Sequence, residues 1–141
     1  MNEPVAVAVL AKAPIPGFAK TRLIPVLGAR GAAMLQRRLV ERAVETACAA
    51  AVGPVSLWTA PDETHPAFQS ISARLAITLA RQAEGDLGAR MLAAITRANA
   101  CVLVIGSDCP ALTPDHLRTA AEVLRNHADV VVIPAEDGGY A

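Results

Sequence analysis

The sequence predicts an α/β protein in which a mostly parallel β-sheet is covered by helices on both faces. Short valine-rich apolar runs alternate with longer segments whose apolar residues repeat at helical spacing. No hairpin signal joins consecutive strands, so a helix is expected to connect each strand to the next. The 141 residues, 53% of them hydrophobic but only 3% aromatic, are enough for one domain with a core of Ala, Val and Leu.

The first strand and the first helix are predicted from the front part of the chain. Residues 5–11 form a continuous apolar run rich in valine, as expected for a strand that is buried on both faces. Residues 29–51 are rich in alanine and place leucine and alanine at helical spacing on one face, with arginine and glutamate on the other. Gly53 and Pro54 are expected to end this helix.

The middle of the chain is expected to add two strands and a short helix. Residues 55–60 (VSLWTA) are rich in residues that favour strands, and Pro61 ends the run. A short helix is expected over residues 65–72. Residues 75–82 (LAITLARQ) predict a third strand, although leucine and alanine have no strong preference for strands.

The last third of the chain predicts two more helices and two more strands. Asp86 follows a glycine and is placed as the N-cap of a helix. Thr113 is the expected N-cap of another helix, because Pro114 suits the first helical position. The elements expected here are a helix over residues 86–99, a strand over 101–106, a helix over 113–126 and a fifth strand over 128–135.

Polar and glycine-rich residues follow four of the predicted strands. In an open parallel sheet, ligands bind beyond the carboxyl ends of the strands, where the strand order reverses. We therefore expect these segments to meet at one edge, with residues 14–22 and 107–110 flanking one crevice. The four segments are KAPIPGFAKTRL (12–23), QAEGDLG (82–88), GSDCPALTP (106–114) and AEDGGY (135–140).

The first of these segments favours phosphate binding. Gly17 allows a close approach of the backbone, the prolines stiffen the loop, and Lys20 and Arg22 supply cations for phosphate oxygens. A P-loop is excluded, because Pro14 and Ala19 stand where its two glycines belong. A basic surface turn without a ligand is the alternative.

The third segment favours a divalent metal. Asp108 comes just after a buried strand, and Mg²⁺ is commonly held by one or two carboxylates together with substrate phosphates. Asp108 is equally suited to a turn position. Asp137 in DGGY and Asp86 in EGDLG are weaker candidates, because each also fits an ordinary turn or helix start.

Taken in order, AKAPIPGFAKTRL, QAEGDLGARM, GSDCPALTPDHL and VVVIPAEDGGY resemble the signatures of the bacterial DUF2064 proteins, also called radical-SAM/selenodomain-associated glycosyltransferase-like proteins. That family is similar to the nucleotide-diphospho-sugar transferases, which have the GT-A fold with a Rossmann-like sheet, and to guanylyltransferases. The resemblance runs from about Val5 to Tyr140. It implies a single nucleotide-binding domain over residues 1–141, with the C-terminal part of the family fold absent, as a fragment or a short member.

The resemblance also implies roles for the matching residues. Lys20 would be the main cation for the nucleotide phosphates, and Asp108 would hold Mg²⁺ or Mn²⁺. Asp137 would act with these two at the catalytic centre. The residues implied in nucleotide binding are Lys12, Pro16, Gly17, Lys20, Arg22, Asp86 and Ser107, and those on the acceptor or sugar side are Gly138, Gly139 and Tyr140.

The function implied is a metal-dependent transferase acting on a nucleoside triphosphate or a nucleotide-diphospho-sugar, with a small-molecule acceptor. Asp108-Cys109-Pro110 replaces the Asp-x-Asp of many glycosyltransferases and is more similar to the nucleotidyltransferase branch. A non-catalytic nucleotide-binding or scaffold domain with the same fold is the alternative. A dinucleotide oxidoreductase is disfavoured, because no G-x-G-x-x-G follows the first strand.

Composition excludes several other classes. The formal net charge is zero and no apolar run approaches the length of a membrane span, so neither nucleic acid nor a membrane is an expected partner. The charge is uneven, since residues 1–53 carry seven Lys and Arg against three acids and the rest carry six against ten. Chance placement and a phosphate-facing front half both fit this split.

Cysteine and histidine usage points to a reduced compartment without a structural metal. The three cysteines have no Cys-x-x-Cys spacing, and the N-terminus lacks the basic region of a signal peptide, so a cytoplasmic protein is expected. The three histidines are scattered and are expected to be surface or capping residues.

Overall fold

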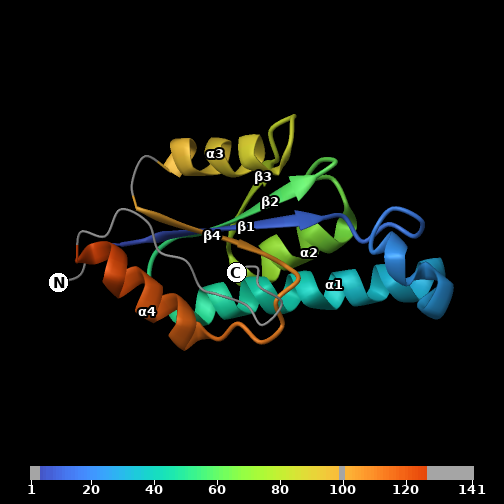
Figure 1. Ribbon diagram of the computed structural model, residues 1–141, viewed down its shortest axis with the longest axis horizontal. Coiled ribbons are helices and arrows are strands. Elements are labelled where there is room, and N and C mark those ends of the chain that lie inside the picture. The colour runs from blue at the N-terminus through green and yellow to red at the C-terminus, as the bar shows by residue number, and fades with distance from the viewer. Residues whose placement is uncertain (1–3, 99–100, 127–141) are drawn as a thin grey trace.

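The computed structural model describes residues 4–98 and 101–126 and confirms the predicted α/β fold (Figure 1). Four strands, all parallel, form one sheet in the order β3-β2-β1-β4. Helix α3 covers one face of the sheet, and α1, α2 and α4 cover the other (Figure 1). The elements are β1 (Ala6–Lys12), the short 3₁₀ helix η1 (Thr21–Leu23), α1 (Ile24–Ala50), β2 (Val55–Ala60), α2 (Pro66–Leu75), β3 (Thr78–Arg81), α3 (Leu87–Ala98), β4 (Val102–Gly106) and α4 (Pro114–Arg125).

The central strand β1 is buried on both faces, as its unbroken apolar run predicts. Val7 and Val9 belong to the larger core, beneath α1, α2 and α4. Ala8 and Leu10 belong to a smaller core with Trp58 of β2, on the side of α3. This alternation follows from the strand period of two, which sends successive side chains to opposite faces.

The larger core joins the sheet to α1, α2 and α4. A fully buried Val, Leu or Phe side chain contributes roughly 1.5–3 kcal/mol to folding, so these layers supply most of the cohesion of the domain. The fully buried side chains include Val40 and Val44 of α1, Leu57 of β2, Phe68 and Ile71 of α2, and Leu117 of α4.

Helix α1 begins at Ile24, earlier than the predicted start at residue 29. Its first turn is interrupted at Gly28, whose backbone is not helical (φ 74°, ψ 164°), so residue 29 is where the regular helix resumes. The turn before the interruption has exposed apolar residues, with Val26 82% exposed. Without a buried face, that turn leaves no helical periodicity for the sequence pattern to reveal.

Strand β3 is shorter than predicted and starts at Thr78 rather than at residue 75. Leu75 is instead the last residue of α2, and Ala76 ends that helix in the left-handed conformation (φ 54°). The apolar run at residues 75–80 is therefore shared between the end of a helix and a strand, which a pattern of apolar residues alone does not separate.

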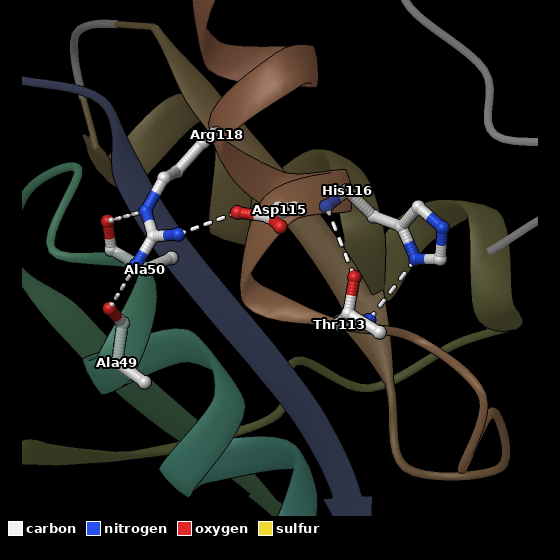
Figure 2. A network of polar contacts seen from close by, with 6 residues as sticks. All are labelled: Ala49, Ala50, Thr113, Asp115, His116 and Arg118. Atoms are coloured by element: carbon white, nitrogen blue, oxygen red, sulfur yellow. Dashed lines mark hydrogen bonds and ion pairs between the residues drawn. The ribbon is translucent and has the colours of Figure 1, made fainter.

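Two histidines cap helices, as expected from their scattered positions. Thr113 and His116 form a capping box at the start of α4, in which the Thr113 Oγ1 accepts from the His116 N–H and the His116 Nδ1 accepts from the Thr113 N–H (Figure 2). His65 caps α2 through its Nδ1, which accepts from the N–H of Ala67 at 3.0 Å. His127 and the predicted strand at 128–135 lie outside the described residues.

The C-terminal end of α1 is capped by α4. The guanidinium of Arg118 donates from Nε to the carbonyl of Ala50 at 3.2 Å and from Nη2 to the carbonyl of Ala49 at 2.9 Å (Figure 2). The Nη1 of the same guanidinium donates to the Oδ1 of Asp115 at 2.6 Å. These bonds satisfy carbonyls that a helix end leaves without partners, and they place a positive charge where the helix dipole is negative.

No helix in the part of the chain that the structure describes is long and apolar enough to cross a membrane.

We predict that Arg118→Met lowers the free energy of unfolding by about 1–2 kcal/mol, because two carbonyls of α1 lose a charged donor that is partly exposed. Denaturant unfolding followed by circular dichroism measures the change. Arg38→Met, at an exposed position of α1, is the matched control and is expected to stay within about 0.5 kcal/mol of the wild type. Equal losses in both variants would contradict the capping role.

Candidate functional site

The segments that follow β1 and β4 meet at the carboxyl edge of the sheet. Strand β1 pairs in parallel with β4 on one side and with β2 on the other, so the order of the strands reverses at β1. Lys20, after β1, forms an ion pair with Asp108, after β4. This contact confirms the expected geometry, in which residues 14–22 and 107–110 flank one site.

The loop of residues 13–20 is folded back on itself. Gly17 (φ +84°) and Lys20 (φ +52°) both have left-handed backbone, which turns the chain sharply at two points. Ala19 is completely buried and donates its N–H to the carbonyl of Ile15 at 3.1 Å. The loop is thus held at Ala19, and the turn at Lys20 directs the chain into η1.

Lys20 and Asp108 differ strongly in their exposure to solvent. The side chain of Lys20 is 17% exposed, whereas that of Asp108 is 76% exposed. A lysine so well covered needs a partner for its ammonium group, and the carboxylate of Asp108 supplies it. Most of the Asp108 side chain is exposed to solvent, where a ligand can reach its carboxylate.

The other two cations of the loop are arranged differently from Lys20. The Nζ of Lys12 lies 4.8 Å from the centroid of the Phe18 ring, in a cation–π contact within the same loop. Arg22 is exposed in η1. Of the three predicted phosphate ligands, only Lys20 therefore contacts the turn after β4.

Helix α1 holds both walls of the site through two side chains. Gln36 donates from Nε2 to the carbonyl of Lys12 at 2.9 Å, at the point where β1 ends. Arg42 donates from Nε to the carbonyl of Pro110 at 2.9 Å, in the turn after β4. The two anchors are six residues apart on one helix, about 9 Å along its axis, so α1 fixes the separation of the two segments.

Sequence reasoning did not single out Gln36. Its residue is only 3% exposed, and the amide Oε1 is buried without a hydrogen-bond partner among the described residues. A signal was present, because Ala32 and Val40 stand four residues to either side and are both buried, which puts Gln36 on the core face of the helix. A glutamine on such a face indicates a buried polar contact.

Gln82 ties together the carboxyl ends of three strands. Its backbone N–H donates to the carbonyl of Thr59 at 2.9 Å. Its side-chain Nε2 donates to the carbonyls of Ala11 at 3.2 Å and Trp58 at 3.0 Å. Arg90 of α3 continues this network by donating to the carbonyl of Gly85 at 3.1 Å. The segment after β3 is thereby fixed against the same edge as the loop after β1.

Of the remaining predicted site residues, three lie within the described residues and four lie outside them. Asp86 accepts the N–H of Ala89 at 2.9 Å and so caps α3, as predicted, and its proposed place near the nucleotide stays a prediction. Ser107 is buried at the base of the turn that carries Asp108, and Pro16 is exposed in the loop. The acceptor-side candidates lie outside the described residues; they are Asp137, Gly138, Gly139 and Tyr140.

Asp108 fits a metal ion that is shared with the phosphates of a substrate. Within residues 4–98 and 101–126, no three His, Cys, Asp or Glu residues are grouped to hold a metal ion. Asp108 offers a single exposed carboxylate. Mg²⁺ commonly binds through one or two carboxylates plus phosphate oxygens and water, so Asp108 suits such a shared ion.

A second carboxylate at the carboxyl edge, Asp62, is occupied by a local turn. The hydroxyl and the N–H of Thr64 donate to the Asp62 Oδ1 at 2.6 and 2.9 Å, and these hydrogen bonds hold the pKa of Asp62 below its ordinary value. Burial raises the pKa of the Cys48 thiol, with Glu45 adding to the effect, which favours the protonated thiol. Neither group contributes to the site around Lys20.

A hollow that does not involve this site lies at the opposite, amino edge of the sheet. It has a volume of about 600 Å³ and is lined by Pro4, residues 50–53, Arg118, Glu122 and Arg125. Arg118 is engaged there with the carbonyls that end α1 (Figure 2). Arg125 donates to the carbonyl of Val52 at 3.3 Å. The hollow therefore lies away from the edge at which ligands of open parallel sheets bind.

We predict that Gln36→Leu loosens the loop after β1 without loosening α1. Loss of the hydrogen bond to the Lys12 carbonyl is expected to speed amide hydrogen exchange at Phe18 and Ala19 about fivefold, which corresponds to roughly 1 kcal/mol. Gln69→Leu is the matched control, because the side chain of Gln69, on α2, makes a similar hydrogen bond to the carbonyl of Glu63. Unchanged exchange in the loop of Gln36→Leu would contradict the anchoring role.

The fold is similar to that of two larger proteins of known structure. A protein from Desulfovibrio desulfuricans G20, assigned as a nucleotide-diphospho-sugar transferase, is 31% identical, with a TM-score of 0.82 over 96% of this chain and 60% of its own. A cytidylyltransferase from Leptospira borgpetersenii serovar Hardjo-bovis (strain JB197) is 14% identical, with a TM-score of 0.61 over 91% of this chain and 51% of its own. The second likeness shows the fold alone. The chain thus spans between half and two thirds of the length of these proteins.

Comparison with curated proteins gives no match. The sequence profile of one family matches residues 40–141, which is more than half of the chain and includes the turn that carries Asp108. This match confirms the family resemblance and covers three of the four motifs; AKAPIPGFAKTRL lies before the matched range. The chain therefore belongs to the DUF2064 family, which is described as an uncharacterized protein conserved in bacteria.

Proposed function

We propose that this chain is the nucleotide-binding part of a metal-dependent transferase, whose donor is a nucleoside triphosphate or a nucleotide-diphospho-sugar. One observation carries the proposal. Lys20 and Asp108 are 88 residues apart in the sequence and contact each other at the point where the strand order reverses. A cation for phosphates and a carboxylate for a metal are thereby placed within reach of one diphosphate group. The similarity to the Desulfovibrio protein supports the donor class.

The side chains of the site take distinct roles in this proposal. Lys20 pairs with phosphate oxygens through its three N–H donors, and Arg22 in η1 adds a second cation. Gly17 lets the loop backbone approach the phosphates. Asp108 holds Mg²⁺ or Mn²⁺ against them. Gln36 and Arg42 of α1 keep the two walls of the site at a fixed separation.

The chemistry requires little covalent participation by the protein. Bound Mg²⁺ or Mn²⁺ supplies positive charge that neutralises the phosphates of the donor and of the leaving group. The residues of this chain position the donor and add the charge of Lys20 where negative charge develops, which is the largest contribution to many phosphoryl and glycosyl transfers. The acceptor is proposed to be a small molecule.

A thermal-shift screen tests the proposal. Nucleoside triphosphates and nucleotide-diphospho-sugars are added with and without MgCl₂ or MnCl₂, and a metal-dependent rise in the melting temperature is the expected result. Product analysis with labelled nucleotide then separates nucleotidyl from glycosyl transfer. Binding without turnover, also in a chain extended beyond residue 141, would favour a non-catalytic nucleotide-binding domain.

We predict that Asp108→Asn removes the metal-dependent part of nucleotide affinity. Asparagine keeps the size and the hydrogen bonding of the side chain but lacks the charge that a hard cation requires. Isothermal titration calorimetry of the best nucleotide, with and without Mg²⁺, measures the effect. Asp115→Asn changes an equally exposed carboxylate on α4 and is expected to leave both affinities unchanged.

We also predict that Lys20→Met weakens nucleotide binding about tenfold or more, and Lys12→Met much less. Lys20 faces Asp108, and a charge-assisted hydrogen bond to phosphate is worth roughly 1.5–3 kcal/mol. The ammonium of Lys12 is already placed over Phe18. Methionine retains the length of either stem, so the comparison isolates the charge. A larger loss at Lys12 would reverse the two roles.

A further inference from the structure

The cation and the carboxylate of the site are bonded to each other. Lys20 donates from Nζ to the Oδ1 of Asp108 in the protein without ligand. We propose that Lys20 closes the cation site on Asp108, so that a divalent metal binds there only together with the phosphates of the nucleotide. This inference rests on the proposed function and concerns the order in which its two ligands bind.

Lys20 and a metal ion compete for the carboxylate of Asp108. Asp108 is the carboxylate of the described site, and it belongs to no group of three or more His, Cys, Asp or Glu residues among the described residues. A metal ion that approaches Asp108 meets an ammonium already in contact with its oxygen. Two positive charges on one carboxylate repel each other, which disfavours the metal while Lys20 is bound to Asp108.

A phosphate group offers the ammonium of Lys20 an alternative partner to Asp108. The side chain of Lys20 is mostly covered, so its ammonium needs a negatively charged or polar acceptor at all times. Phosphate oxygens at the loop would accept the same N–H donors. Transfer of Lys20 from Asp108 to phosphate then leaves Asp108 open, and metal and phosphates together satisfy every charge of the site.

The other lysine of the loop provides the contrast that makes the inference testable. Lys12 is the last residue of β1, and its ammonium faces the Phe18 ring and not Asp108. Removing either lysine subtracts one positive charge from the loop. Only removal of Lys20 also uncovers the carboxylate, so a direct lock and a general charge effect predict different results.

Binding of Mn²⁺ alone is the decisive measurement. The full chain is titrated with MnCl₂ without nucleotide, and free Mn²⁺ is followed by electron paramagnetic resonance. The wild type is expected to bind with a dissociation constant on the order of 1 mM or weaker, as suits one carboxylate. Lys20→Met is expected to bind about fivefold more tightly, the factor that corresponds to an ion pair of roughly 1 kcal/mol. Lys12→Met is expected to match the wild type.

A double variant establishes where the metal binds. Lys20→Met combined with Asp108→Asn is expected to lose the gain, because the uncovered carboxylate is gone. The same Lys20→Met protein is expected to bind nucleotide more weakly than the wild type. Opposite effects on metal and on nucleotide are the signature of the lock, whereas a merely structural role of Lys20 would weaken both.

Two results would overturn the inference: unchanged or weaker Mn²⁺ binding by Lys20→Met, or an equal gain in Lys12→Met. Circular dichroism verifies folding, and Lys20→Asn replaces the methionine variant if that variant does not fold, because asparagine tolerates left-handed backbone. The Mn²⁺ arm uses no nucleotide, so its failure is distinct from failure of the proposed function, which would appear as no nucleotide binding in the wild type.

Discussion

The parallel pairing of β1 on both sides is the constraint on which the site depends. Its register with β2 runs to Lys12 opposite Ala60, whereas its register with β4 runs only to Leu10 opposite Gly106. The chain therefore leaves β4 two positions before it leaves β1. Both connections start at one edge of the sheet, and a long side chain such as that of Lys20 spans the distance between them.

Helix α1 couples this edge to the rest of the domain. Near its middle, Gln36 and Arg42 donate to carbonyls of the two site segments. At its C-terminal end, its own carbonyls accept from Arg118 of α4. Between these points the helix packs its apolar face on the sheet through Val40 and Val44. The packing of the core and the spacing of the site walls are consequently set by one rigid element.

Local patterns predicted the elements well where one residue type has one structural meaning. The strand over residues 55–60 and the N-cap at Thr113 were confirmed without change, because a run of strand-favouring residues ended by proline and a Thr-Pro pair each favour a single conformation. Residues 75–77 were assigned wrongly to a strand, because leucine and alanine suit a helix end equally well. The order of the strands was expected only from the general rule for such sheets, since pairing joins residues far apart in the sequence.

The candidate site was predictable in part, for a related reason. Lys20 and Asp108 stand in loops, where a charged residue beside glycine or proline indicates chemistry and not packing. Gln36 and Gln82 act on backbone carbonyls of distant segments. The helical spacing places Gln36 on a core face, but no local pattern identifies the carbonyl that either glutamine binds, because that partner is set by the fold.

The three cations of the first loop illustrate how one charge pattern supports different physical roles. Lys12 is placed over an aromatic ring, Arg22 is exposed at the start of a helix, and Lys20 is covered and paired with a carboxylate from the other half of the chain. The basic front half and the acidic back half thus meet at this point. Other ion pairs, such as that of Arg74 with Glu45, join half-exposed groups and contribute little to stability. A covered lysine whose partner faces solvent is a different arrangement, because a ligand can replace the partner without exposing the lysine.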